Sequence, residues 1–123
     1  MAETDLFRAL REKENEGTIW TLRGSKDLNA NLVRFEAGGG VEAHVNEQVD
    51  VLFVGVGGYG TVSIEDEDRD LRAGIAVFVP KGSRRSVTAG PEGVSYLSVH
   101  RRRGLPGIGS RPRRDNADEN GGS

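Results

Sequence analysis

Glycine divides this chain into short apolar runs that lie too close together for helices to connect them. Of the 123 residues, 18 are glycine, which is roughly twice the ordinary share. A crossover between parallel strands needs about a dozen residues or more, whereas the runs here follow one another directly. The sequence therefore predicts antiparallel strands in an all-β sandwich or barrel, and we expect a closed or nearly closed barrel.

A short amphipathic helix is expected before the strands. Thr4 and Asp5 can cap it, its apolar side chains begin at Leu6, and Gly17 ends it. Residues 1–16 are thus predicted to form an N-terminal helical segment, and residues 17–103 the barrel. Nine strand-like runs are expected, at Thr18–Arg23, Asn29–Glu36, Val41–His44, Gln48–Gly57, Gly60–Glu65, Asp70–Ala73, Ile75–Val79, Arg84–Ala89 and Val94–Arg101.

Residues 104–123 lack the apolar side chains that a core needs. They offer only Leu105, Ile108 and Ala117, so we expect a flexible tail. Its charges divide into a basic part, which continues from Arg101, and an acidic end. These charges either keep a loose end solvated or contact a partner.

The charge balance disfavours nucleic acid and membrane surfaces as partners. Lys and Arg number 17 against 19 Asp and Glu, a formal net charge of -2, so no overall basic field exists. The longest uncharged apolar run, Val51 to Gly58, is far shorter than the roughly 18 residues of a membrane span. The chain has no cysteine, which fits a reducing cytosol. We expect a cytoplasmic protein.

The run Gln48–Gly57 is apolar on both faces if it is extended. A strand of this kind must be covered on both sides. One face would line the barrel interior, and the other would meet a second sheet, the N-terminal segment or another subunit, so we expect a homodimer formed through the outer face. Parity places Gln48, Asp50, Leu52, Val54 and Val56 on one side and Val49, Val51 and Phe53 on the other.

Two motifs carry a resemblance to a known family. The first motif has the consensus spacing G-x5-H-x-H-x3-E-x6-G. In this chain it runs from Gly38 through His44, Asn46 and Asp50 to Gly57. The glycines at its two ends permit turns with positive φ before and after a strand. They shape the barrel and perform no chemistry.

The second motif begins after a gap of 16 residues and has the spacing G-x5-P-x-G-x2-H-x3-N. It runs from Gly74 through Pro80 and Gly82 to Arg85, and Pro80 ends a strand because proline donates no ladder hydrogen bond. With both motifs in order, the chain resembles a single-domain bacterial cupin of the RmlC-like jelly-roll superfamily over about Thr18 to Arg101. The resemblance implies a double-stranded β-helix, or jelly-roll barrel.

The same resemblance implies a metal site, from which this sequence departs. A typical metal-binding cupin uses two histidines and a carboxylate from the first motif and a histidine from the second. Here the four positions read His44, Asn46, Asp50 and Arg85. The side-chain amide of asparagine is a poor ligand for zinc, iron or nickel, and arginine, which is always protonated, cannot be a ligand. We therefore expect no tightly bound metal and no cofactor. His100 could supply a second imidazole if strand register brings it inside, which leaves a weak metal site open.

We predict a ligand-binding cluster of His44, Asn46, Gln48 and Asp50 on the inward face, with Arg85 from a neighbouring strand. Arg85 either pairs with Asp50, because a buried charge needs a partner, or is partly neutralised and binds a small carboxylate together with His44. Apolar residues would line the rest of the interior, namely Val33, Phe35, Leu52 and Val54.

The leading functional hypothesis is a module that binds a small polar or anionic metabolite in the barrel. A second hypothesis is a cupin enzyme, either an isomerase or epimerase in which His44 and Asp50 transfer protons, or a dioxygenase-like protein with a weak metal. A third is a protein-interaction module that uses the basic stretch Arg101–Arg114. The sequence contains no P-loop, no G-x-S-x-G elbow and no H-E-x-x-H motif, so enzymatic activity stays open.

Overall fold

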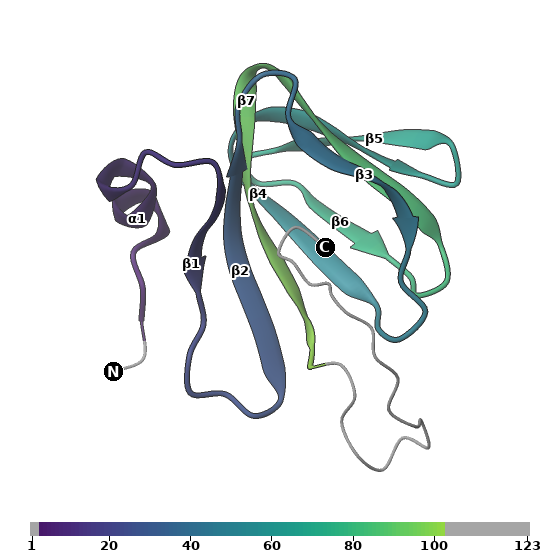
Figure 1. Cartoon of the computed structure of the whole chain (residues 1–123), viewed down its shortest axis with the longest axis horizontal. Helices are drawn as coiled ribbons and strands as arrows, with labels where there is room; N and C mark the ends of the chain where they lie inside the picture. Colours follow the sequence, from purple (N-terminus) through teal and green to yellow (C-terminus); the bar gives the residue numbers. More distant parts are fainter. Residues whose placement is uncertain (1–2, 103–123) are drawn as a thin grey trace.

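The computed structural model describes residues 3–102, and this part of the chain contains one helix and seven strands (Figure 1). The expected N-terminal helix and the antiparallel all-β fold are confirmed. The predicted tail at residues 104–123 lies outside the described residues. The elements are α1 (Leu6–Glu12), β1 (Gly17–Thr21), β2 (Leu28–Phe35), β3 (Gly40–Val45), β4 (Val51–Ile64), β5 (Glu67–Arg72), β6 (Ala76–Val79) and β7 (Arg84–Arg101).

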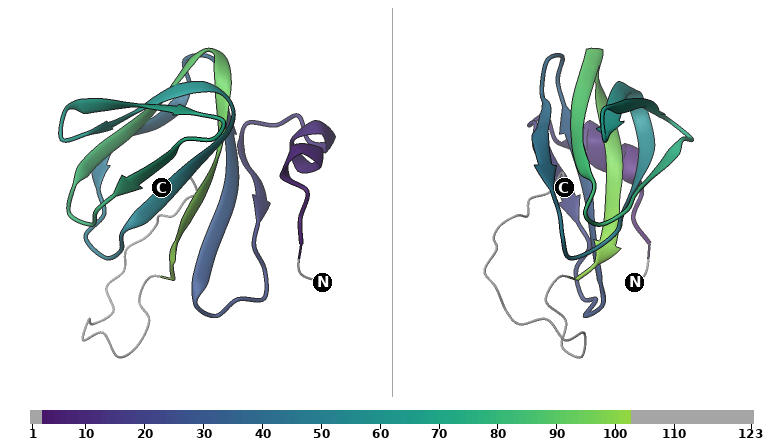
Figure 2. Two further views of the ribbon diagram at one scale, coloured as in Figure 1. Left: turned by 180° about the vertical axis from the view of Figure 1, so that it is seen from behind. Right: turned by 90° about the vertical axis from the view of Figure 1, so that its right-hand side faces the viewer.

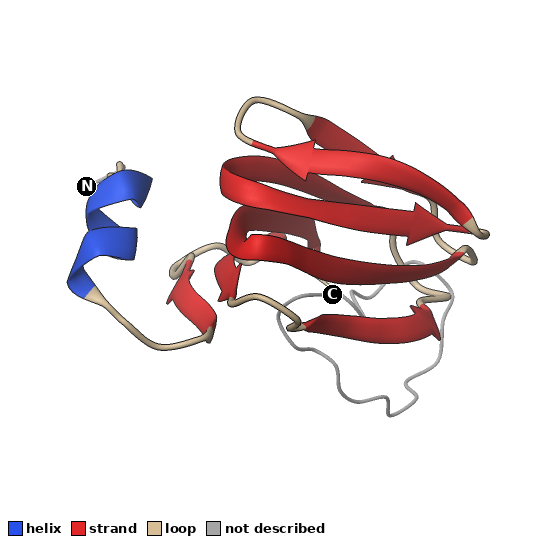
Figure 3. Ribbon diagram, turned by 90° about the horizontal axis from the view of Figure 1, so that it is seen from above, coloured by secondary structure: helices blue, strands red, loops and turns tan. Residues whose placement is uncertain are grey.

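The long strands β4 and β7 hold the sheet together. β7 pairs antiparallel with β2, β3 and β4, and β4 also pairs with β5 and β6. The hydrogen-bonded order is β1-β2-β7-β4-β5, with β3 joined to β7 and β6 joined to β4. Figure 2 shows how the strands curl round into an open barrel, and Figure 3 shows α1 standing apart at the β1 side.

Glycines in the middle of β4 bend this strand and do not end it. The sequence predicts two separate runs here, Gln48–Gly57 and Gly60–Glu65, whereas the structure has one strand. Its pairing with β7 shifts register between Gly55 and Gly57 and again between Gly58 and Gly60. Such bulges tighten the twist of a strand and let one strand serve two parts of a barrel. The two last predicted runs merge in the same way into β7.

The start of β4 differs from the prediction because a turn precedes it. β3 ends at Val45 and β4 begins at Val51, and the segment between them is not extended. Asn46 Oδ1 accepts hydrogen bonds from the amides of Gln48 at 2.8 Å and Val49 at 3.3 Å, which closes the turn.

This turn reverses the expected faces of β4. Val51 and Phe53 are buried in the barrel core, whereas Leu52 is 39% exposed on the outside, with Val54 on the same face. The placement of Leu52 and Val54 in the interior was therefore wrong. Parity counted from His44 fails because it holds only while the chain stays extended.

The hydrophobic core is built from side chains of β2, β4, β5, β6 and β7, together with Val49 before β4. Val33 is part of it and Phe35 packs against it, as predicted. The ring of Tyr96 packs edge-on against Phe53, with 5.1 Å between ring centroids. The buried cluster consists of Val33, Val49, Val51, Phe53, Val62, Leu71, Val77, Val79, Val87, Ala89, Val94 and Tyr96.

The helix α1 contributes nothing to this core. Asp5 caps it by accepting a hydrogen bond from the Arg8 amide at 3.0 Å, but none of its residues is buried and Phe7 is 60% exposed. Within residues 3–102, no helix is long and apolar enough to cross a membrane.

Candidate functional site inside the barrel

His44 and Arg85 face each other across the β3–β7 pair, at the positions where the two sequence motifs place them. Arg85 is 1% exposed, and its Nε donates to Nε2 of His44 at 3.1 Å. The other ring nitrogen, Nδ1, lies 3.0 Å from the carbonyl oxygen of Glu42. Because a carbonyl only accepts and a guanidinium only donates, we assign His44 as neutral, with its proton on Nδ1.

Asn46 and Gln48 belong to the turn that follows β3. Asn46 is 8% exposed, and its carbonyl oxygen is used by the turn described above. Gln48 is half-buried, and its backbone carbonyl accepts from Arg101 at 3.3 Å. Asn46 therefore holds the chain in position beside His44, and its side-chain nitrogen is buried without a hydrogen-bond partner among residues 3–102.

Asp50 does not join this cluster. Its side chain is exposed, and Oδ1 accepts from the Lys81 amide at 2.8 Å. The turn at Pro80 and Gly82 leaves that amide outside the sheet ladder, so the carboxylate of Asp50 stabilises the turn. The predicted ion pair between Arg85 and Asp50 is therefore wrong, since Asp50 lies at the surface and Arg85 in the interior.

Three polar residues of β7 complete the interior surface. Tyr96, Ser98 and His100 alternate along the strand and are 0%, 1% and 6% exposed. His100 pairs in register with Asn29, and its Nδ1 lies 2.8 Å from the carbonyl oxygen of Arg101. Strand register therefore brings His100 inside, which the sequence left open.

Tyr96 and Ser98 are not among the predicted site residues, although the sequence contains a signal for them. In the run Val94–Arg101, residues with even numbers share one face of an extended strand, and that face begins with the apolar Val94. Counting from Val94 would have placed Tyr96, Ser98 and His100 together in the interior.

Several buried polar atoms in this region have no hydrogen-bond partner among the described residues. They are the hydroxyls of Tyr96 and Ser98 and the side-chain nitrogen of Asn46. A buried polar group left without a partner costs about 1–3 kcal/mol, so such groups usually contact water or a ligand. Tyr96 and Ser98 lie on the same face of β7, so two of these atoms are close to the core.

Burial also determines the protonation of Tyr96. Loss of hydration raises the pKa of its phenol well above the ordinary value, and the positive charge of Arg85 acts in the opposite direction. The phenol is therefore neutral at physiological pH and can donate a hydrogen bond.

The residues present do not fit the metal centre that the motif resemblance implies. The lone pair of His44 Nε2 is directed at Arg85, and Asp50 binds the Lys81 amide. A guanidinium cannot ligate a metal, and it would repel a dication placed beside it. In the described range, no three His, Asp or Glu side chains are grouped so that they could hold a metal ion.

Comparisons with known proteins find one curated relative and several solved structures of similar fold. No protein-family model matches the chain. Dimethylsulfoniopropionate lyase DddW from Ruegeria pomeroyi is 27% identical over 71 residues, which are 58% of this chain and 46% of the lyase. The matched region thus spans less than half of that relative.

Two solved structures show the similarity in three dimensions. KdgF from Halomonas sp. is 26% identical with a TM-score of 0.63, covering 69% of this chain and 78% of that one. A cupin-2 domain containing protein from Shewanella frigidimarina is 19% identical with a TM-score of 0.65, covering 80% of this chain and 94% of that one. The barrel described above is the fold of these structures.

Proposed function

We propose that this protein, which is a cupin by fold, binds a small polar or anionic metabolite inside its barrel without a tightly held metal. The main observation in support is the set of buried hydrogen-bonding groups on β7. Among them, the hydroxyls of Tyr96 and Ser98 have no hydrogen-bond partner among residues 3–102. Arg85 and His44 lie in the same interior, so the site combines a fixed cation with neutral donors.

The charges of this interior favour an anion. Arg85 is always protonated, His44 is neutral while it accepts from Arg85, and the phenol of Tyr96 is neutral. The guanidinium of Arg85 attracts a carboxylate, and this attraction is stronger in the buried interior than in water. A guanidinium also binds carboxylates in a two-pronged geometry.

The hydroxyl groups would supply the rest of the recognition. Tyr96 and Ser98 can each donate one hydrogen bond and accept others, and the Asn46 side-chain nitrogen can only donate. A ligand that satisfies them would carry acceptor oxygens besides its charged group, as sugar acids and hydroxy acids do. An apolar ligand would leave these groups unsatisfied.

A thermal-shift screen with organic acids and sugar acids tests this proposal, after elemental analysis of the purified protein. We expect less than stoichiometric transition metal, and melting temperatures that rise with particular acids. Arg85→Met should abolish that rise, and Arg84→Met is the matched control because Arg84 is exposed. One equivalent of bound metal, or an undiminished shift in Arg85→Met, would overturn the proposal.

A cupin enzyme is the second candidate, favoured by the lyase among the relatives. Proton transfer shared by His44 and Asp50 has little support, because Asp50 is exposed and bound to the Lys81 amide. A lyase assay on dimethylsulfoniopropionate, with and without added divalent metal, separates this candidate from a binding module. Turnover would favour the enzyme.

We also propose that the protein is a cytoplasmic homodimer formed through the outer face of the sheet. Leu52 of β4 and Phe78 of β6 are directly paired and are 39% and 56% exposed. Large apolar side chains gathered on one sheet face usually mark an interaction surface. Sedimentation equilibrium at micromolar concentration tests the dimer, and the mass of a single chain would exclude it.

A further inference from the structure

The polar surface of β7 continues across the inner faces of β2 and β1. Directly paired residues of antiparallel strands point to the same face of a sheet. Ser98, which is buried inside the barrel, is paired with Asn31 of β2, and Asn31 is paired with Thr21 of β1. His100, also buried, is paired with Asn29 in the same way. Polar side chains from three strands therefore form one row on the inner face.

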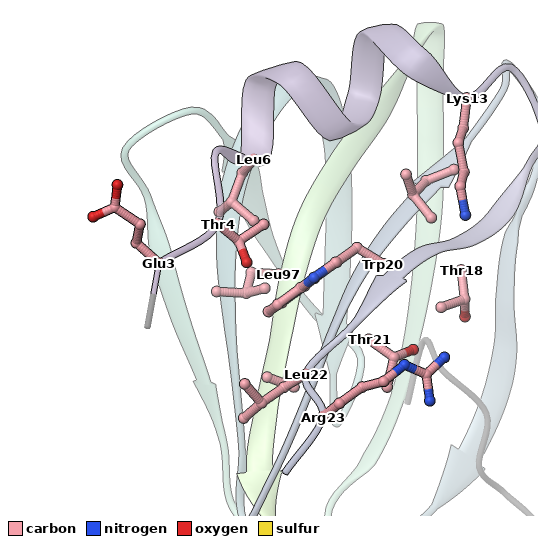
Figure 4. A pocket seen from close by; sticks show the side chains of 12 residues that line it. Glu3, Thr4, Leu6, Lys13, Thr18, Trp20, Thr21, Leu22, Arg23 and Leu97 are labelled. Carbon is pink, nitrogen blue, oxygen red and sulfur yellow. The ribbon is translucent and has the colours of Figure 1, made fainter. Parts of the chain in front are cut away.

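The outer face of the same strands is apolar. Trp20 of β1 and Leu97 of β7 line a cavity there, which Leu6 of α1 also borders (Figure 4). Leu32 of β2 is paired with both Trp20 and Leu97. In a sheet that only encloses a core, the inner face is the apolar one. The pattern is reversed at this place, so the inner face is suited to contact a polar molecule.

Two hydrogen bonds give the polar row a direction. Thr21 Oγ1 donates to Asn31 Oδ1 at 2.7 Å, and Asn31 Nδ2 donates to Asn29 Oδ1 at 3.0 Å. Each amide oxygen therefore accepts within the row, whereas each amide nitrogen has a further hydrogen to donate. Both asparagines are half-buried, so a ligand can reach them. Because their amides are oriented before a ligand arrives, less conformational freedom is lost on binding.

Ser98 adds a buried hydroxyl beside these amides. It is 1% exposed, and its Oγ has no hydrogen-bond partner among residues 3–102. Directly opposite residues of antiparallel strands have Cβ atoms about 4.5–5.5 Å apart, so this hydroxyl lies next to the amide of Asn31. A buried hydroxyl of this kind usually contacts water or a ligand. An oxygen atom of a ligand placed here would bond with both side chains.

The polar row and the His44–Arg85 pair belong to the same end of the barrel. Arg101, which follows His100 at the end of β7, donates from its guanidinium to the backbone carbonyl of Gln48 at 3.3 Å. Gln48 lies in the turn directly after β3, the strand that carries His44. The end of β7 therefore lies beside the end of β3, so one ligand can meet both groups.

We propose that Asn29, Asn31 and Ser98 form a second recognition surface, which binds the hydroxyl oxygens of an acid whose carboxylate is held by Arg85. This inference rests on the proposed function and names its ligand class, a polyhydroxy carboxylate. Thr21 is a positioning residue, because its hydroxyl orients the amide of Asn31. A site built to bond a hydroxyl discriminates against an analogue that lacks it, since the polar groups of the site are then left unpaired.

Calorimetric titration of the full chain with two matched acids tests this inference. Gluconate and hexanoate have the same charge and the same number of carbon atoms, but only gluconate carries hydroxyl groups. We expect gluconate to bind at least about tenfold more tightly, as two or more additional hydrogen bonds imply. Equal affinities of the wild type for the two acids would overturn this inference and leave the proposed function intact.

Alanine variants locate the effect. Asn29→Ala and Ser98→Ala should each weaken gluconate binding about 3–10-fold, as loss of one neutral hydrogen bond implies, and leave hexanoate binding unchanged. Ser98→Ala should fold, because it removes a buried hydroxyl without a partner in the described range. Asn15→Ala is the matched control, since Asn15 is exposed outside the barrel. Equal weakening of both acids, or unchanged gluconate binding in the folded variants, contradicts the inference.

The positioning role of Thr21 has its own test. Thr21→Val removes the hydroxyl that orients Asn31, and Thr21→Ser keeps it. Gluconate binding should weaken in the first variant and recover in the second, with hexanoate unaffected by either, and circular dichroism melting checks that both fold. If the wild type binds neither acid, this inference is overturned, and the proposed function falls with it only if no acid of the thermal-shift screen binds.

Discussion

Arg85 donates a hydrogen bond from Nε to Nε2 of His44 at 3.1 Å, across the pair of strands that carries the two sequence motifs. The imidazole is thereby kept neutral, and its second nitrogen is held by the carbonyl of Glu42. The barrel interior thus places the positive charge of Arg85 beside the neutral imidazole of His44.

His44→Ala should lower the free energy of unfolding by about 1–3 kcal/mol, because Arg85 Nε loses its described acceptor within a buried region. His44→Gln should recover part of this loss, since its amide oxygen can accept the same hydrogen bond. Urea denaturation of both variants measures the difference. Equal stability of His44→Ala and the wild type would mean that the hydrogen bond is not stabilising.

Stability should fall at alkaline pH because of Tyr96. Burial raises the pKa of this phenol in the folded state, so the unfolded state loses its proton first as the pH rises. Above about pH 10 the free energy of unfolding should fall by about 1.4 kcal/mol per pH unit from this group. Tyr96→Phe should reduce that slope, measured by urea denaturation at several pH values, and an unchanged slope would exclude Tyr96 as its source.

Asn46→Ala should destabilise the protein more than Asp50→Ala. Asn46 Oδ1 accepts from two backbone amides in a buried turn, and its loss should cost about 1–2 kcal/mol. Asp50 accepts from one amide at the surface, so its loss should cost about 0.5–1 kcal/mol and leave acid-induced thermal shifts unchanged. If Asp50→Ala is instead the more destabilised variant and also loses the thermal shift with organic acids, an ion pair between Asp50 and Arg85 would be supported.

Two neighbouring glycines of β4 should respond differently to alanine. A Cβ at Gly55 would lie 2.0 Å from the carbonyl oxygen of Arg72, whereas nothing lies within 4 Å of a Cβ at Gly57. Gly55→Ala should therefore cost about 3 kcal/mol or more, as overpacking does when backbone must move. Gly57→Ala should change stability by less than about 1 kcal/mol. Thermal melting compares the two, and equal effects would contradict the close approach of β5 to β4.

The sequence by itself determined the fold class and the positions of His44 and Arg85. Glycine spacing excludes crossover helices, and the two motifs place these residues at corresponding points of paired strands. Alternation along β7 also carried the signal for Tyr96 and Ser98, which required only that the strand be extended.

Only the tertiary structure decided the partners of these residues and the faces of β4. Asn46 closes a turn before β4, and this turn changes the parity that a linear count from His44 assumes. Asp50 then binds the Lys81 amide at the surface, while Arg85 lies in the interior beside His44. Parity is a local property that holds within one strand, whereas the contacts of a turn depend on segments that are distant in sequence.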